Sequence, residues 1–136
     1  VVALALFVLW RRALGRTGRE NARRGRRGRR AEAAAERLLT AHGFRVLERQ
    51  AHAEWPMRVD GAPVTATLRA DLLVERGGRR YVAEVKSGAA GARPETPDTR
   101  RQLLEYLLAF AVDGILLVDM HSERVRTVEF PSVELL

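Results

Sequence analysis

The pair Gly77–Gly78 narrows the possible folds of this chain more than any other feature. It separates two runs rich in β-forming residues, 64–76 and 79–88. Two-residue loops of glycine are typical of tight hairpin turns, so we expect the flanking runs to pair as antiparallel strands. Arg76 then faces Arg79, and the register of the whole hairpin follows. Since side chains alternate along a strand, this register also decides which residues share a face.

Segments before this hairpin predict a helix and another extended strand. Residues 31–43 contain strong helix formers with Gly43 as a C-terminal stop, which favours a helix. Residues 44–59 are expected to be extended, and Asp60–Gly61 is a turn signal. Together with the glycine hairpin, this gives a helix followed by three strands.

The segments after the hairpin predict a second helix and two more strands. Following a loop over 88–98, we expect a helix capped by Asp98 or Thr99 and running to about Val112. Its expected buried face consists of Leu103, Leu104, Leu107, Leu108 and Ala111. The continuous apolar run over 114–120 is typical of a strand covered on both faces, and a last strand is expected over 125–130. The order α-β-β-β-α-β-β indicates an α/β domain with a mixed sheet and helices on both sides.

The N-terminal part of the chain differs in composition from the remainder. Residues 1–14 begin with ten apolar residues, about half the length that a membrane-spanning helix needs. Residues 15–30 are rich in glycine and arginine without apolar periodicity, so we expect a disordered linker before a domain over 31–136. Arginines directly after the apolar run favour a cytoplasmic domain that contacts the inner face of a membrane. A truncated membrane anchor and a short apolar helix are both open readings of residues 1–14.

Charge and cysteine content restrict the chemistry. The net charge is +7, but residues 11–30 hold ten arginines against the single acid Glu20, so the expected domain is mildly acidic. It therefore lacks the composition of a broad DNA-binding face. The absence of cysteine excludes disulfides, thiolate metal sites and a cysteine nucleophile. Lys86 is the only lysine beside 23 arginines, which hints at a task that suits a compact ammonium group and not a guanidinium fork.

Three polar residues are predicted to gather on the hairpin. In the register expected from Gly77–Gly78, Asp71 lies opposite Glu84 with their Cβ atoms about 5 Å apart. Lys86 projects from the same face as Glu84. Facing carboxylates in an apolar setting destabilise a sheet unless a cation lies between them, and hard oxygen ligands suit Mg²⁺ or Mn²⁺. We therefore expect metal-assisted phosphodiester hydrolysis, with a solvated strand face as the ordinary alternative.

The spacing of these residues resembles the signature of the PD-(D/E)xK nuclease superfamily. Asp71 is followed by twelve residues and then by Glu84, Val85 and Lys86. The similarity extends over 31–118 and implies a restriction-endonuclease-like αβββαβ core, with a mixed central sheet flanked by helices. It also implies that Asp71, Glu84 and the main-chain carbonyl of Val85 bind the metal. Lys86 would orient or deprotonate the attacking water.

Both expected helices carry further parts of the resemblance. An Ala-rich helix containing Glu32, followed by Gly43–Phe44, is similar to the first helix of Holliday-junction-resolvase-like members. This implies Glu32 as an additional acidic site residue, and Glu36, one turn away, competes for that role. Gln102 and Tyr106 share a helix face and resemble the Q-x-x-x-Y element of RecB-like exonucleases. That element would place Gln102 near the metal and Tyr106 close behind it.

Taken together, these patterns predict a Mg²⁺-dependent deoxyribonuclease. DNA is the expected partner, with RNA and every DNA form open, and the resemblance adds a homodimer as an expectation. One rival reading is a nuclease-fold protein that only binds nucleic acid and has no affinity for metal. Another is a membrane-proximal interaction module, in which Glu84 and Lys86 face solvent away from Asp71.

Overall fold

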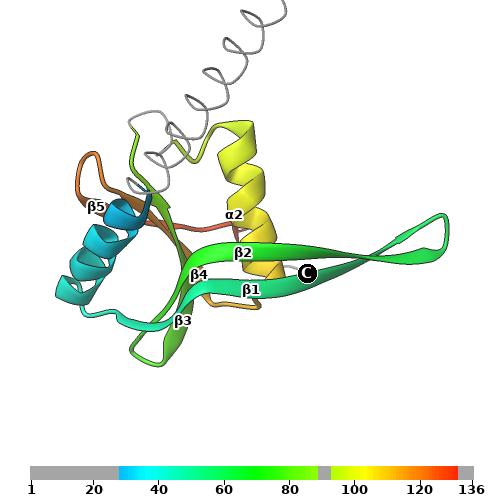
Figure 1. Cartoon of the computed structure of the whole chain (residues 1–136), viewed down its shortest axis with the longest axis horizontal. Helices are drawn as coiled ribbons and strands as arrows, with labels where there is room; N and C mark the ends of the chain where they lie inside the picture. Colours follow the sequence, from blue (N-terminus) through cyan, green and yellow to red (C-terminus); the bar gives the residue numbers. More distant parts are fainter. Residues whose placement is uncertain (1–27, 89–92, 132–136) are drawn as a thin grey trace, which may run out of the picture. The chain divides into compact units, whose positions relative to one another are not determined.

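The computed structural model describes residues 28–88 and 93–131 (Figure 1). The chain divides into two units, Val1–Arg30 and Ala31–Leu136, and the second contains all five strands, the helix α2 and most of the N-terminal helix. The apolar segment expected over 1–14 lies outside the described residues. No helix within the described part of the chain is both long enough and apolar enough to cross a membrane.

Residues 28–30 are already helical, although we expected them to belong to the linker. They form one helix with residues 31–41, here called the N-terminal helix. Arginine is a good helix former, and the alanine-rich run that follows supplies the hydrogen-bonded turns onto which these residues can extend. The remainder of the expected linker, residues 15–27, lies outside the described residues.

Five strands form one mixed sheet in the order β1-β2-β3-β4-β5. They are β1 (Arg45–Val59), β2 (Ala62–Arg76), β3 (Arg79–Lys86), β4 (Gly114–Asp119) and β5 (Arg124–Val128). β3 and β4 are parallel, and every other pair is antiparallel. The helix α2 (Pro97–Ala109) lies in the connection between the two parallel strands, which cannot be joined by a tight turn. The expected α/β class and element order are confirmed.

The β2–β3 hairpin has the register that its glycine turn predicts. Arg76 pairs with Arg79, and the ladder continues to the pair formed by Leu72 and Ala83. Both turn residues, Gly77 and Gly78, have positive φ, of 59° and 76°. Such angles are accessible to glycine without strain, which explains why two glycines occupy this turn.

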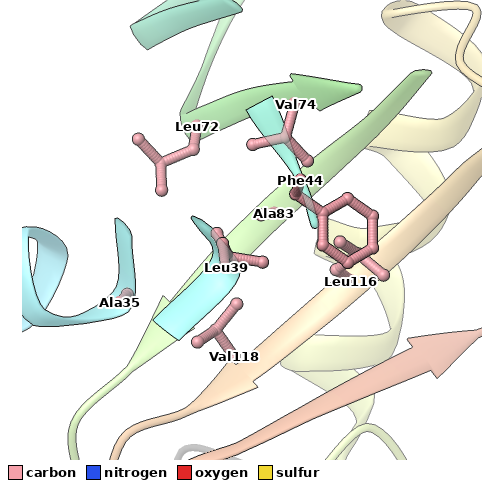
Figure 2. Close-up of a cluster of buried hydrophobic side chains, with 8 residues drawn as sticks. All are labelled: Ala35, Leu39, Phe44, Leu72, Val74, Ala83, Leu116 and Val118. Carbon is pink, nitrogen blue, oxygen red and sulfur yellow. The ribbon is translucent and has the colours of Figure 1, made fainter. Parts of the chain in front are cut away.

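The two faces of the sheet carry separate hydrophobic cores. On the first face, Ala35 and Leu39 of the N-terminal helix pack against strand residues, as Figure 2 shows. On the second face, Leu103 and Tyr106 of α2 pack against the other side of the same strands. β4 contributes to both cores, and its residues Ile115, Leu116, Leu117 and Val118 are all buried. The expected strand covered on both faces is therefore confirmed.

The bounds and buried face of α2 differ from expectation. Its N-cap is Thr96 and not Asp98 or Thr99, because Pro97 fits the first helical position, where no amide donor is needed. The helix ends at Ala109, since Ala111 adopts a left-handed φ of 49° that stops it before Val112. Its buried residues are Thr99, Leu103 and Tyr106. Leu108, which we expected to be buried, is 41% exposed.

The β1–β2 hairpin extends beyond α2 as a long two-stranded ribbon (Figure 1). Paired residues on one face of this ribbon are all apolar. They are Ala51 with Ala70, Ala53 with Leu68, Trp55 with Ala66, Met57 with Val64, and Val59 with Ala62. The inner pair belongs to the core under α2, whereas Met57, Val59 and Val64 are 42–55% exposed. The apolar face therefore continues past the helix that covers its base.

Truncating a core leucine should destabilise the fold far more than truncating the exposed leucine of α2. Leu116 is 1% exposed in the core of the first face, so Leu116→Ala should cost about 2–5 kcal/mol of unfolding free energy. Leu108→Ala, at the exposed position of α2, should cost less than about 1 kcal/mol. Urea unfolding followed by tryptophan fluorescence compares the two. Equal losses would contradict this description of the core.

Candidate active site

The site begins where the β2–β3 ladder ends. The last regular pair of this ladder is Leu72 with Ala83, and Asp71 is the next residue on β2. The Asp71 carboxylate accepts a hydrogen bond from the main-chain amide of Val85 on β3, at 2.8 Å. A side-chain oxygen thus takes the place of a main-chain acceptor, so the strands stay together although the regular ladder has stopped. Asp71 and Glu84 occupy the next position of the predicted register, with the Asp71 carboxylate directed at the main chain of β3.

Both strands of the β1–β2 hairpin are irregular at the same level. Gln50 occupies the cross-strand position of Asp71, because the residues on either side of it pair in one register with β2. Its φ of 50° is unusual for a residue other than glycine. On β2, Ala70 packs into the core under α2 and Leu72 packs into the opposite core, so the alternation of side chains shifts at Asp71. This local irregularity gives Asp71 its position between the two faces.

Glu84 is a buried acid with an incompletely satisfied carboxylate. The residue is 5% exposed, and its Oε1 accepts a hydrogen bond from Lys86 Nζ at 2.9 Å. Its Oε2 is buried with no hydrogen-bond partner among the described residues. Burial raises the pKa of Glu84, and the negative charge of Asp71 raises it further. Lys86 and Gln102 lower this pKa, but burial and Asp71 together raise it by more.

A chain of hydrogen bonds connects Lys86 to the main chain of β2. Lys86 Nζ donates to Gln102 Oε1 at 3.2 Å, and Gln102 Nε2 donates to the Tyr106 hydroxyl at 2.9 Å. The hydroxyl in turn donates to the carbonyl of Arg69 at 2.8 Å. Burial and the charge of Glu84 raise the pKa of Tyr106 to about 12, so this hydroxyl stays protonated at neutral pH. The helix α2 therefore supplies the polar groups that enclose Glu84 and Lys86.

The two candidate acids of the N-terminal helix have different partners. The Glu32 carboxylate accepts a hydrogen bond from Gln50 Nε2 at 2.8 Å, which connects it to the strand position opposite Asp71. Glu36 forms an ion pair with the guanidinium of Arg49, whose side chain is 68% exposed. Of the two, Glu32 is thus the acid linked to the site.

The structure brings together most of the residues that the sequence singles out. Asp71, Glu84 and Lys86 converge with the main chain of Val85 and with Gln102. Glu32 joins them only through Gln50, which sequence reasoning missed. Its role depends on a left-handed backbone angle inside an otherwise extended segment, and the sequence carries no signal for that angle.

A groove of about 360 Å³ lies between β2 and α2 and reaches the site residues Gln102 and Tyr106. Its remaining lining residues are Thr67, Leu68, Arg69, Asp98, Arg101 and Glu105. Because the lining carries two arginines and two acids, the groove itself has no strong charge.

The potential metal ligands are few. Within residues 28–88 and 93–131, no group of three or more His, Cys, Asp or Glu side chains could hold a metal ion. The pair formed by Asp71 and Glu84 supplies two carboxylates. A cation at this position would need further oxygen ligands from the main chain or from water, as Mg²⁺ usually does.

Over the described residues, the fold is α/β, with a five-stranded mixed sheet and two helices, and a part-buried acid–lysine cluster lies where the β2–β3 hairpin ends. No family model matches the chain, and no curated protein matches it significantly. The chain is similar to a solved structure titled "Crystal structure of SSO0001", with a TM-score of 0.57 and 20% sequence identity. The similarity covers 74% of this chain and 48% of that one, so this chain spans about half of its length. At this identity the likeness concerns the fold alone.

Neutralising Glu84 should stabilise the metal-free protein at neutral pH. Because the folded-state pKa of Glu84 lies above the ordinary value of 4.5, the folded chain binds the proton more tightly than the unfolded chain. Stability is therefore lost as pH rises from about 4.5 through the raised pKa. We expect Glu84→Gln to unfold at a higher urea concentration than the wild type at pH 7, with a smaller difference at pH 4. Glu105→Gln, at an exposed position of α2, is the control and should show neither effect.

Proposed function

We propose that this chain is a metal-dependent nuclease that hydrolyses phosphodiester bonds of DNA. One observation carries the proposal: Glu84 is buried beside the charge of Asp71 and is hydrogen-bonded to the only lysine of the chain, and one of its carboxylate oxygens has no partner in the described part of the chain. Groups of this kind reduce the stability of the fold. They are found mainly at functional sites, because there the chemistry requires them.

A divalent cation fits the chemistry of these residues. An unpaired buried carboxylate oxygen costs stability, and so does the repulsion between Asp71 and Glu84. A hard cation such as Mg²⁺ or Mn²⁺ would relieve both costs at once. Asp71, Glu84 and the main-chain carbonyl of Val85 would hold it. The cation would supply an activated water and neutralise negative charge that develops on the phosphate.

The remaining side chains would orient the reacting groups. Lys86 presents a compact ammonium group, held at Glu84 and Gln102, that can position a water molecule or bind a phosphate oxygen. Gln102 would keep that group in place from α2. Glu32, through Gln50, would add negative charge on the opposite side of Asp71.

The fold supports the same proposal at a coarser level. A helix, a three-stranded meander, a crossover helix and a parallel strand follow one another as in the αβββαβ core of restriction-endonuclease-like proteins. An argument from fold alone is an analogy, so the weight rests on the site. The reading as a membrane-proximal module required Glu84 and Lys86 to face solvent, whereas Glu84 is 5% exposed.

The partners follow from this function. DNA is the substrate we propose, with a homodimer as one possible assembly. Contact of residues 1–14 with the inner face of a membrane is a proposal that rests on their apolar sequence and on the arginines that follow.

Substitutions in the site should abolish metal-dependent cleavage. We expect the full chain to cut linear, single-stranded or branched DNA in the presence of Mg²⁺. Asp71→Asn keeps an acceptor for the Val85 amide but loses the carboxylate charge, and Lys86→Ala removes the ammonium group. We expect both variants to fold, and each to lose at least about 100-fold in the rate of cleavage. Asp98→Asn, at an exposed position of α2, is the matched control and should cut normally. Cutting that persists in both site variants would place the activity elsewhere. Binding without cutting would favour the binding-only reading.

Mg²⁺ should stabilise the protein through Glu84. If the cation binds the folded chain, the melting temperature rises with the concentration of Mg²⁺. The increase should disappear in Glu84→Gln and persist in Glu105→Gln, as thermal unfolding with and without chelator can measure. An equal increase in all three proteins would mean that the cation acts at another place.

A further inference from the structure

Tyr106 occupies the end of the hydrogen-bond chain that reaches Lys86. Its hydroxyl has one hydrogen, which it donates to the main-chain carbonyl of Arg69 at 2.8 Å. That carbonyl can only accept, so the direction of this bond is determined by chemistry. The hydroxyl oxygen is then left with lone pairs and can only accept from its second neighbour, the Gln102 amide group, at 2.9 Å.

The direction of these bonds determines which end of the Gln102 carboxamide faces Lys86. Since Nε2 is directed to Tyr106, Oε1 is the atom that meets Lys86 Nζ, at 3.2 Å. The opposite orientation would place an amide donor against an ammonium donor, and neither group could accept. The carboxamide is therefore oriented from both ends: Nε2 donates to Tyr106, and Oε1 accepts from Lys86. Of these two contacts, only the one with Tyr106 is tied to the main chain of β2.

The surroundings of Tyr106 keep its hydroxyl in place. The residue is 5% exposed, and its ring meets the ring of Phe110 edge to face with centroids 5.9 Å apart. Its acceptor, Arg69, lies two residues before Asp71 on β2. The same bond therefore ties α2 to the strand that carries the first acid of the site.

We propose that Tyr106 is a positioning residue, which orients the Gln102 carboxamide so that its oxygen holds the Lys86 ammonium group against Glu84. The consequence for catalysis rests on the proposed nuclease function. The effect on Lys86 itself does not, because it concerns only the arrangement of side chains. The two parts can therefore be measured separately.

The lone lysine makes the structural part measurable. Tyr106→Phe keeps the ring but removes the hydroxyl, so the Gln102 carboxamide loses one of the two contacts that orient it, and the acceptor of Lys86 is held less firmly. The rate at which a water-soluble acylating reagent modifies Lys86, followed by mass spectrometry of the peptide that contains it, should rise about threefold or more. Tyr81→Phe is a matched control, because Tyr81 is the only other tyrosine and packs against Phe44 in the opposite core. It should leave the rate unchanged.

A double variant tests whether Tyr106 acts through Gln102. Gln102→Leu should also raise the acylation rate of Lys86, and adding Tyr106→Phe to it should cause no further increase. Additive effects in the double variant would overturn the proposal, because Tyr106 would then act on Lys86 by another route. So would an acylation rate in Tyr106→Phe equal to that of Tyr81→Phe, with both variants melting near the wild-type temperature.

Kinetics test the catalytic part. In Tyr106→Phe, kcat for DNA cleavage should fall about tenfold while KM stays within about twofold, since the substrate is bound but the ammonium group is poorly placed. A change in KM alone would contradict a positioning role. If the wild type cuts no DNA, the nuclease function fails. The acylation rates then decide the positioning role by themselves.

Discussion

Where the β2–β3 ladder ends, the amide of Val85 donates to the carboxylate of Asp71 and not to a main-chain carbonyl. This bond holds the two strands together at a point where their regular pairing has stopped. It also brings the charge of Asp71 close to Glu84. Because Glu84 is buried as well, its own negative charge is destabilising, and its pKa is raised. An acidic pair, a shifted alternation on β2 and a left-handed Gln50 on β1 all occur at this one level of the sheet.

The helices complete the site from the two sides of the sheet. From α2 come Gln102 and Tyr106, which bond Lys86 to the main chain of β2. From the N-terminal helix comes Glu32, which bonds to Gln50. Each helix is held by its own hydrophobic core, so the polar groups are positioned by apolar packing on both faces. Such support is what a cluster of like charges needs in order to persist in a folded chain.

Most of the fold could be predicted from local signals, whereas part of the site could not. Glycine turns and strand periodicity gave the register that places Asp71 beside Glu84, and helical spacing gave the shared face of Gln102 and Tyr106. The left-handed angle of Gln50 had no local signal. The resemblance favoured Glu32 over Glu36, but the hydrogen bond between Glu32 and Gln50 could not be predicted from the sequence. That bond depends on where the N-terminal helix lies against β1, which is a matter of packing between distant segments.

The amino-acid sequence alone determined the order of the elements, the turn at Gly77–Gly78 and the residues that a hydrolytic site would use. These properties follow from backbone preferences and side-chain alternation, which act over a few neighbouring residues. Only the tertiary structure decided that Glu84 is buried with one carboxylate oxygen unpaired among the described residues, that Gln102 donates to Tyr106, and that Leu108 lies outside the core. Burial and hydrogen-bond direction depend on what covers a side chain, and here the covering groups come from segments far away along the chain.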